Sequence, residues 1–233
     1  MHAPLIIAHR GDSSRALENS TEAVRLALSL PVDMIEIDIR KSRDNVLYVM
    51  HDKDTGRTAD QNIDIEQSTS DEIGHVKLKN GESIPVLMDI LGLVSGTVGL
   101  NIEIKSDGAG GLCAGHLLGA GYRGPMLVSS FKEREVLDAR RVMPGLVASE
   151  IFDSFTLKDV NGYKAKGYSV ISLKKKILNE ELMAACHERK IRVYVWTVDE
   201  EDEMNKFITW GVDGIYSNKP AVLKRLVEEH SKQ

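Results

Sequence analysis

Cysteine is scarce in this 233-residue sequence and long apolar runs are absent, and each of these features narrows the class of protein to which the chain can belong. Only two cysteines occur, and neither has a partner at metal-ligand spacing, which argues against a cysteine-based metal site and favours a reduced, intracellular protein. No run reaches the roughly 18 apolar residues of a membrane span, and no basic leader followed by an apolar segment opens the chain. We therefore expect a cytoplasmic protein without integral membrane association.

Positive charge is not in excess either. Lys and Arg number 30 against 35 Asp and Glu, so the formal net charge is −5. This balance provides no electrostatic reason to expect nucleic-acid binding. A small anionic substrate would need a local basic site. The sequence carries no signal for an oligomeric state.

The residues that are present have ordinary globular proportions, with 42% hydrophobic and 28% charged side chains. A chain of this length can bury a full hydrophobic core without disulfide or metal staples, so any bound metal would serve chemistry. No linker or change of composition divides the sequence, which predicts one domain over residues 1–233.

Short aliphatic runs alternate with amphipathic segments along nearly the whole chain, a rhythm typical of βα units. The predicted strands are Leu5–His9, Met34–Arg40, Val46–Met50, Gly99–Lys105, Met126–Ser129, Leu146–Ile151, Ser169–Ser172, Arg192–Trp196 and Asp213–Ser217. The predicted helices are Thr21–Leu30, Val86–Val94, Cys113–Gly119, Glu133–Val142, Asn179–Arg189, Asp202–Trp210 and Ala221–His230. We expect an α/β fold, a (β/α)₈ TIM barrel, for which nine strands are one too many.

The third predicted strand is the exception to the rhythm. Lys41–Asn45 is too short for the crossover that parallel strands need. Val46–Met50 is therefore either the return strand of a hairpin or a distorted barrel strand, and the sequence leaves both open. The polar segment 53–85 that follows has no clear periodicity, and we interpret it as an insertion over the mouth of a site.

Two predicted strands carry charges where a parallel sheet normally has aliphatic residues. Glu36 and Asp38 alternate with isoleucines in one strand, and Glu103 and Lys105 do so in another. Alternation by itself fits half-exposed antiparallel strands, but in a βα barrel these carboxylates point inward. Converging buried carboxylates need a cation. Three hard oxygen donors suit one divalent cation, Mg²⁺ or Ca²⁺.

Two histidines lie where the mouth of the barrel is expected. His9 ends the first predicted strand and His51 the third. Catalytic residues of such barrels gather at the carboxyl ends of strands, and a histidine pair can divide general-acid and general-base roles near neutral pH. We predict that His9 and His51 are catalytic.

An ordered series of motifs resembles the glycerophosphodiester phosphodiesterase family, whose barrel is similar to that of phosphoinositide-specific phospholipase C. The series spans almost the whole chain and begins with His9-Arg10-Gly11, Glu18-Asn19, Glu36-x-Asp38, His51-Asp52 and Glu103-Ile104-Lys105. It continues through Ser129-Ser130-Phe131, Val195-Trp196-Thr197-Val198 and Gly211-Val212-Asp213-Gly214-Ile215.

The resemblance implies metal-dependent hydrolysis of small glycerophosphodiesters, such as glycerophosphocholine and glycerophosphoethanolamine, to sn-glycerol 3-phosphate and an alcohol. The implied roles are metal binding by Glu36, Asp38 and Glu103, acid–base catalysis by His9 and His51, and phosphate binding by Arg10 and Lys105. We expect Glu18 and Asn19 to support the first loop and the metal ligands.

Three other functions fit the same barrel. Two are enzymatic, a lysophospholipase D and a lyase that forms a cyclic phosphate. The third is a catalytically silent protein that only binds the ligand, against which the intact histidines and Glu36-x-Asp38 argue.

Overall fold

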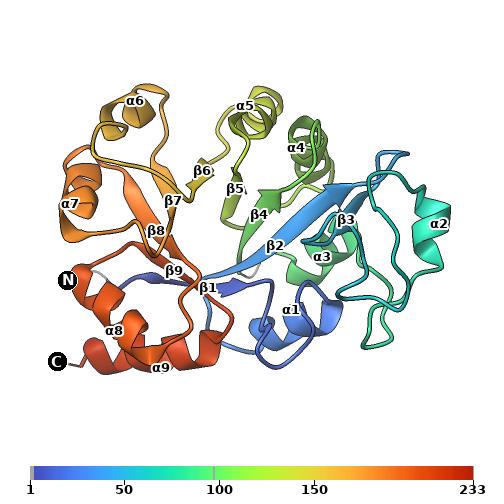
Figure 1. Ribbon diagram of the computed structural model, residues 1–233, viewed down its shortest axis with the longest axis horizontal. Coiled ribbons are helices and arrows are strands. Elements are labelled where there is room, and N and C mark those ends of the chain that lie inside the picture. The colour runs from blue at the N-terminus through green and yellow to red at the C-terminus, as the bar shows by residue number, and fades with distance from the viewer. Residues whose placement is uncertain (1–2, 97, 233) are drawn as a thin grey trace.

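The computed structural model describes residues 3–96 and 98–232, in which eight parallel strands close into a barrel (Figure 1). The strands pair in the order β1-β9-β8-β7-β6-β5-β4-β2, and pairing between β1 and β2 completes the ring. Their bounds are β1 (Leu5–His9), β2 (Met34–Lys41), β4 (Gly99–Ile104), β5 (Met126–Ser130), β6 (Ala148–Phe152), β7 (Val170–Lys174), β8 (Arg192–Trp196) and β9 (Gly214–Ser217). The predicted (β/α)₈ barrel is confirmed.

Helices lie between the strands and surround the barrel (Figure 1). They are α1 (Thr21–Leu28), α2 (Ser70–Gly74), α3 (Leu87–Val94), α4 (Gly110–Gly119), α5 (Glu133–Val142), α6 (Val160–Ala165), α7 (Glu180–Glu188), α8 (Glu201–Trp210) and α9 (Pro220–His230). The sequence prediction lacked the short helices α2 and α6. Within the described part of the chain, none of these helices combines the length and apolarity needed to cross a membrane.

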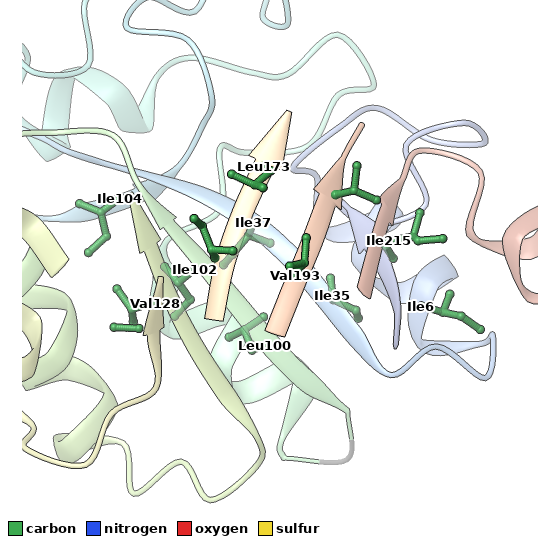
Figure 2. Close-up of a cluster of buried hydrophobic side chains, with 14 of the residues drawn as sticks. Ile6, Ile35, Ile37, Leu100, Ile102, Ile104, Val128, Leu173, Val193 and Ile215 are labelled. Carbon is green, nitrogen blue, oxygen red and sulfur yellow. The ribbon is translucent and has the colours of Figure 1, made fainter. Parts of the chain in front are cut away.

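The alternation in β2 separates two environments. Ile35 and Ile37 are fully buried in the apolar layer between the strands and the outer helices (Figure 2), and Ile39 is buried in the same cluster. Glu36 and Asp38, on the opposite face, are also buried. Burying each isoleucine stabilises the fold by about 1.5–3 kcal/mol, so a one-residue slip, which would exchange the two faces, is strongly disfavoured.

The remaining strand, β3 (Leu47–Val49), is not part of the barrel. It pairs antiparallel with the end of β2, with Val49 opposite Ile39 and Leu47 opposite Lys41. The hairpin alternative is therefore correct. His51, which follows β3, therefore does not come at the end of a barrel strand, because β2 extends past the ring and β3 returns along it toward the barrel. This return places His51 close to the level of Asp38, whose carbonyl oxygen accepts the Met50 N–H at 3.0 Å.

The segment 53–85 is polar in sequence but has an apolar centre of its own. Ala59, Ile65, Ile73, Val76, Leu78 and Ile84 are buried with Tyr48 and Met50. The segment also caps a barrel helix, because both Thr21 N–H and Glu22 N–H at the start of α1 donate to the Glu82 carboxylate, at 2.9 and 3.1 Å. It is thus attached to the barrel by packing and hydrogen bonds.

Candidate active site

A cavity of about 160 Å³ brings together most of the residues singled out from the sequence. His9, Arg10, Glu36, His51, Glu103 and Lys105 all line it. Asp38 lies fully buried beside them, while Glu18 and Asn19 contact Arg10 and Asp38 from the loop after β1. A larger hollow of about 630 Å³ between α5 and the segment that precedes β7 is lined by Arg140, Arg141 and Lys166 but by no carboxylate or imidazole, so it does not compete as a candidate catalytic site.

A tight turn after β1 positions the first of these groups. Arg10 and Gly11 both have positive φ, 60° and 80°, and a Cβ on Gly11 would lie 2.6 Å from the carbonyl carbon of Ala23. Glycine is therefore required where the turn touches α1. The left-handed conformation at Arg10 accompanies a functional contact, since its backbone N–H donates to Glu36 Oε2 at 2.8 Å.

Three carboxylates form a buried cluster at the β2–β4 side of the cavity. Asp38 and Glu103 are lateral neighbours in the paired strands, and Glu36 is the neighbour of His9. One oxygen from each of Glu36, Asp38 and Glu103 can be chosen so that all three lie within 4.8 Å of one another. Burial, and next the charge of Asp38, raises the pKa of Glu36 well above its usual range and that of Glu103 to about 7.

These features fit a divalent cation. Glu36 Oε1 is buried and has no hydrogen-bond partner in the described chain. Burying a carboxylate oxygen without a partner is costly, and three converging carboxylates repel one another unless a cation neutralises them. All the donors are hard oxygens, the type that Mg²⁺ and Ca²⁺ prefer. The cluster could therefore hold such an ion.

Two cationic side chains flank the cluster. Arg10 Nε lies 3.2 Å from Asp38 Oδ2, and Lys105 Nζ lies 3.1 Å from Asp38 Oδ1 while also pairing with Glu103. Burial by itself would raise the pKa of Asp38, but Lys105 and Arg10 hold it below its usual range. Asp38 is thus the carboxylate that stays ionised at the centre of the cluster.

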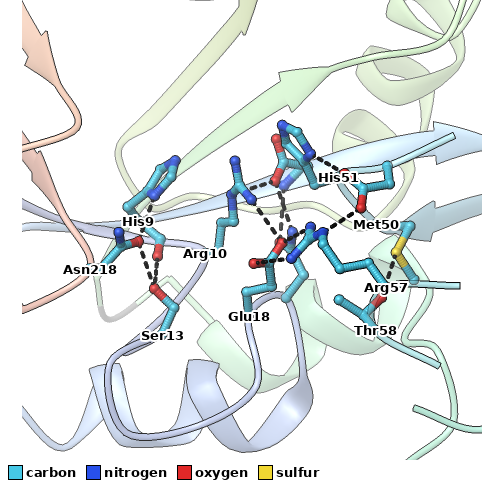
Figure 3. A network of polar contacts seen from close by, with 12 residues as sticks. His9, Arg10, Ser13, Glu18, Met50, His51, Arg57, Thr58 and Asn218 are labelled. Carbon is cyan, nitrogen blue, oxygen red and sulfur yellow. Dashed lines mark hydrogen bonds and ion pairs between the residues drawn. The ribbon is translucent and has the colours of Figure 1, made fainter. Parts of the chain in front are cut away.

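Glu18 and Asn19, in the loop after β1, contact residues of this arrangement. Glu18 accepts from Arg10 Nη1 at 2.7 Å and from both terminal nitrogens of Arg57, at 2.8 and 2.6 Å (Figure 3). Asn19, at φ 58°, donates to Asp38 Oδ2 at 2.8 Å and accepts from the Asp38 backbone N–H at 3.2 Å. Neither lines the cavity; Glu18 holds Arg10, which contacts the cluster, and Asn19 holds Asp38, which belongs to it.

Each histidine is oriented through Nδ1 (Figure 3). His9 Nδ1 lies 2.8 Å from Asn218 Oδ1, and His51 Nδ1 lies 2.6 Å from Asp52 Oδ1. Burial, followed by Arg10, lowers the pKa of His9 to about 4, and burial also lowers the pKa of His51. Both imidazoles are therefore neutral near pH 7 in this environment, with Nε2 left for proton transfer.

Sequence reasoning missed several groups that complete the site. Asn218 and Ser13 hold His9, with Ser13 Oγ donating to both His9 O and Asn218 Oδ1 at 2.8 Å. Asp52 was visible in the motif after His51, but its bond to Arg57 Nε at 2.6 Å was not.

A buried hydrogen-bonded layer also runs across the barrel interior, formed by Asn101, Ser129, Ser149, Ser172 and Tyr216. Small polar residues at inward-facing strand positions were the available signal for it.

Comparisons with known proteins find relatives along almost the whole chain. The model of the glycerophosphoryl diester phosphodiesterase family matches residues 9–222. A glycerophosphodiester phosphodiesterase of Caldanaerobacter subterraneus subsp. tengcongensis is 29% identical over 239 residues, covering 97% of this chain and 98% of the relative. One from Bacillus altitudinis is 27% identical over 246 residues, covering 96% and 98%.

Solved structures show the same fold. A phosphodiesterase from Oleispira antarctica, in complex with the product sn-glycerol-3-phosphate, superposes with a TM-score of 0.89 at 21% identity and 97% coverage of both chains. A glycerophosphodiester phosphodiesterase from Parabacteroides distasonis gives a TM-score of 0.88 at 24% identity and 98% coverage of both chains.

Proposed function

This chain belongs to the glycerophosphoryl diester phosphodiesterase family, and we propose that it hydrolyses glycerophosphodiesters to sn-glycerol 3-phosphate and an alcohol. The observation that carries the proposal is the convergence of His9, His51 and the Glu36–Asp38–Glu103 cluster on one cavity. The product complex of the Oleispira antarctica phosphodiesterase supports the nature of the product.

The proposed substrates are small, water-soluble diesters such as glycerophosphocholine and glycerophosphoethanolamine. A cavity of about 160 Å³ is small, which favours a compact diester over one carrying a long acyl chain within the cavity. Water adds across one P–O bond, so the phosphate remains on glycerol and the alcohol leaves with a proton.

In this mechanism Glu36, Asp38 and Glu103 hold one divalent cation, Mg²⁺ or Ca²⁺. When bound, the cation polarises the phosphate and offsets its negative charge. Arg10 and Lys105 bind the phosphate oxygens from the same side of the cavity, where their side chains are already held by Asp38. A charge-assisted hydrogen bond from each would stabilise charge that develops in the transition state.

His9 and His51 divide the two proton transfers. One neutral imidazole takes the proton of the attacking oxygen, and the other histidine, protonated, gives a proton to the departing alkoxide. Asn218 and Asp52 orient the two rings through Nδ1. The partner at Nδ1 is a neutral amide for His9 and a carboxylate for His51. The two imidazoles therefore differ in how readily they take up a proton, and a division into acid and base requires such a difference.

Product analysis tests the proposal. Phosphorus NMR of glycerophosphoethanolamine incubated with the protein and Mg²⁺ or Ca²⁺ should show sn-glycerol 3-phosphate as the accumulating product. A cyclic glycerophosphate as the end product would instead identify a lyase. Consumption only of lysophospholipids, with release of lysophosphatidic acid, would identify a lysophospholipase D.

A further inference from the structure

We propose that Lys174 selects the alcohol arm of the substrate, so that the site favours neutral polyol arms, as in glycerophosphoglycerol, over quaternary ammonium arms, as in glycerophosphocholine. The inference rests on the proposed function and specifies the substrate class of that same site. It follows from the position of Lys174, from the aromatic rings near it, and from the lack of a carboxylate partner for it in the described chain.

Lys174 stands across the barrel from the carboxylate cluster. It is the last residue of β7, and in the closed strand order β7 lies opposite β2, which carries Glu36 and Asp38. Its lateral neighbour on β8 is Trp196, which lines the cavity. Lys174 Nζ lies 5.8 Å from the centre of the Trp196 ring. The lysine is therefore placed at the β7–β8 side of the cavity.

The two sides of the cavity suit different parts of a phosphodiester. The β1–β2–β4 side provides carboxylates, imidazoles and cations that can bind phosphate oxygens and glycerol hydroxyls. The opposite side provides Phe131, Ile151, Ser172, Trp196 and Thr197, none of which is acidic. Glycerol is common to all the proposed substrates and has hydroxyls for the polar side. The variable alcohol arm is then directed to the β7–β8 side.

Aromatic rings on that side resemble a site for a quaternary ammonium group, but lysines already occupy them. Phe131 and Trp196 meet edge to face, with centroids 5.6 Å apart. Aromatic faces bind choline by attracting its cation. Here Lys105 Nζ lies 5.8 Å from the Phe131 ring and Lys174 Nζ lies 5.8 Å from the Trp196 ring. A choline group at these rings would meet both ammonium groups, of which Lys105 is already paired with Asp38 and Glu103.

The charge of Lys174, unlike that of Lys105, is uncompensated by any carboxylate in the described chain. No carboxylate lies within ion-pair distance of Lys174 in the part of the chain that the structure describes, whereas its neighbour Lys175 pairs with Glu203 at 2.5 Å. Unpaired like charges brought together in a partly buried site repel appreciably. Neutral hydroxyls avoid this repulsion, and the Lys174 ammonium can donate hydrogen bonds to them.

The test compares kcat/KM for glycerophosphoglycerol and glycerophosphocholine at low and high salt. We expect the wild-type protein to prefer glycerophosphoglycerol, and Lys174→Glu to lower that preference ratio by about tenfold or more at low salt, with a smaller change at high salt because ions screen the charge. Lys176→Glu makes the same charge change at an exposed neighbouring position and should leave the ratio within about twofold.

Lys174→Met removes the charge without reversing it and should give an intermediate ratio, which keeps the test valid if the glutamate variant does not fold. An unchanged ratio in the Lys174 variants, or an equal change in Lys176→Glu, would overturn the inference while leaving the hydrolytic function intact. Failure of the wild-type protein to hydrolyse either diester would instead remove the proposed function, and the inference with it.

Discussion

Asn218 holds His9 in a single neutral tautomer. Asn218 Nδ2 donates to Asp199 Oδ2 at 2.7 Å, which fixes Oδ1 as the atom 2.8 Å from His9 Nδ1. An amide oxygen only accepts, so His9 Nδ1 donates and Nε2 is left without a proton. The contact joins residues 209 positions apart, linking the end of β1 to the residue after β9.

Removing this support should slow turnover. Asn218→Ala deletes the acceptor for both His9 and Ser13 and frees the ring to rotate. We expect kcat to fall by about 10- to 100-fold, the usual effect of losing a group that orients a functional side chain. Steady-state kinetics check this, with Ser13→Ala as the matched control that keeps the His9–Asn218 bond. A larger loss in Ser13→Ala would contradict the assigned role.

Replacing either histidine should have a greater effect. His9→Ala and His51→Ala each remove a proposed proton-transfer group, and we expect kcat to fall by about 10²- to 10⁴-fold with little change in urea midpoint. His116→Ala, on the outer helix α4 with its ring bonded to Leu112 O, is the control and should turn over normally. Normal kcat in both His9→Ala and His51→Ala would exclude acid–base catalysis by this pair.

A divalent cation should stabilise the folded protein, and Glu36 should decide how much. A ligand that binds only the native state adds about 2.7 kcal/mol at 100 times its Kd. Glu36→Gln should be at least as stable as wild type in EDTA, because it relieves repulsion in the buried cluster, and less stable than wild type in saturating Mg²⁺ or Ca²⁺. Thermal unfolding of both proteins, in EDTA and in saturating cation, shows whether the order of their stabilities reverses.

Glu203→Gln, which alters a carboxylate paired with Lys175, is the control and should respond to the cation as wild type does. If Glu36→Gln also kept the full wild-type shift in Tm, Glu36 would not belong to the metal-binding set. This readout does not depend on catalytic activity.

A buried carboxylate outside the site should make stability depend on pH. Burial raises the pKa of Glu150, against the opposing effect of Lys166, 3.3 Å away. Its proton is therefore held more tightly in the folded state, so the stability it contributes is present below its ordinary pKa of about 4.3 and lost as pH rises through the folded pKa. As pH rises from about 4.3 through the folded-state pKa, the free energy of unfolding of wild type should therefore fall relative to that of Glu150→Gln. Urea titrations at successive pH values check it, and a pH-independent difference would contradict it.

The polar segment 53–85 should stabilise the barrel through Glu82. Its carboxylate accepts the N–H groups of Thr21 and Glu22, and loss of such a cap costs about 0.5–2 kcal/mol. Glu82→Ala should lower the free energy of unfolding by about 1 kcal/mol, and Glu82→Gln, which keeps an acceptor, by less. Equal stabilities of the three proteins would show that the contact is energetically neutral.

The strands and long helices could be predicted because their patterns are local. Ile35, Ile37 and Ile39 alternate with charged residues, and this alternation, taken together with the βα rhythm of the chain, placed Glu36 and Asp38 inside the barrel. The short helices had no such signal. The helix α2, Ser70–Gly74, buries only Ile73 and so has no periodicity, although the capping pair Thr69 and Glu72 was visible. The helix α6, Val160–Ala165, contains a glycine and lacks a side-chain cap.

The path of the chain around His51 depended on tertiary structure. Five residues between β2 and β3 exclude a crossover helix, but nothing local shows whether the returning strand joins the ring. The partners of the site residues were inaccessible for the same reason, because Asn218 meets His9, and Arg57 meets Glu18, only once the barrel closes. Such contacts join distant segments, and no sequence spacing encodes them.

The most direct test of this account is release of sn-glycerol 3-phosphate by the purified protein. Glycerophosphoglycerol, glycerophosphoethanolamine and glycerophosphocholine would each be assayed with Mg²⁺, with Ca²⁺ and with EDTA, beside His9→Ala. We expect release that requires a divalent cation, stops in EDTA, returns when the cation is restored, and falls at least about 100-fold in the variant. Folded protein that releases no glycerol 3-phosphate with either cation, or releases it equally in EDTA, would contradict the account.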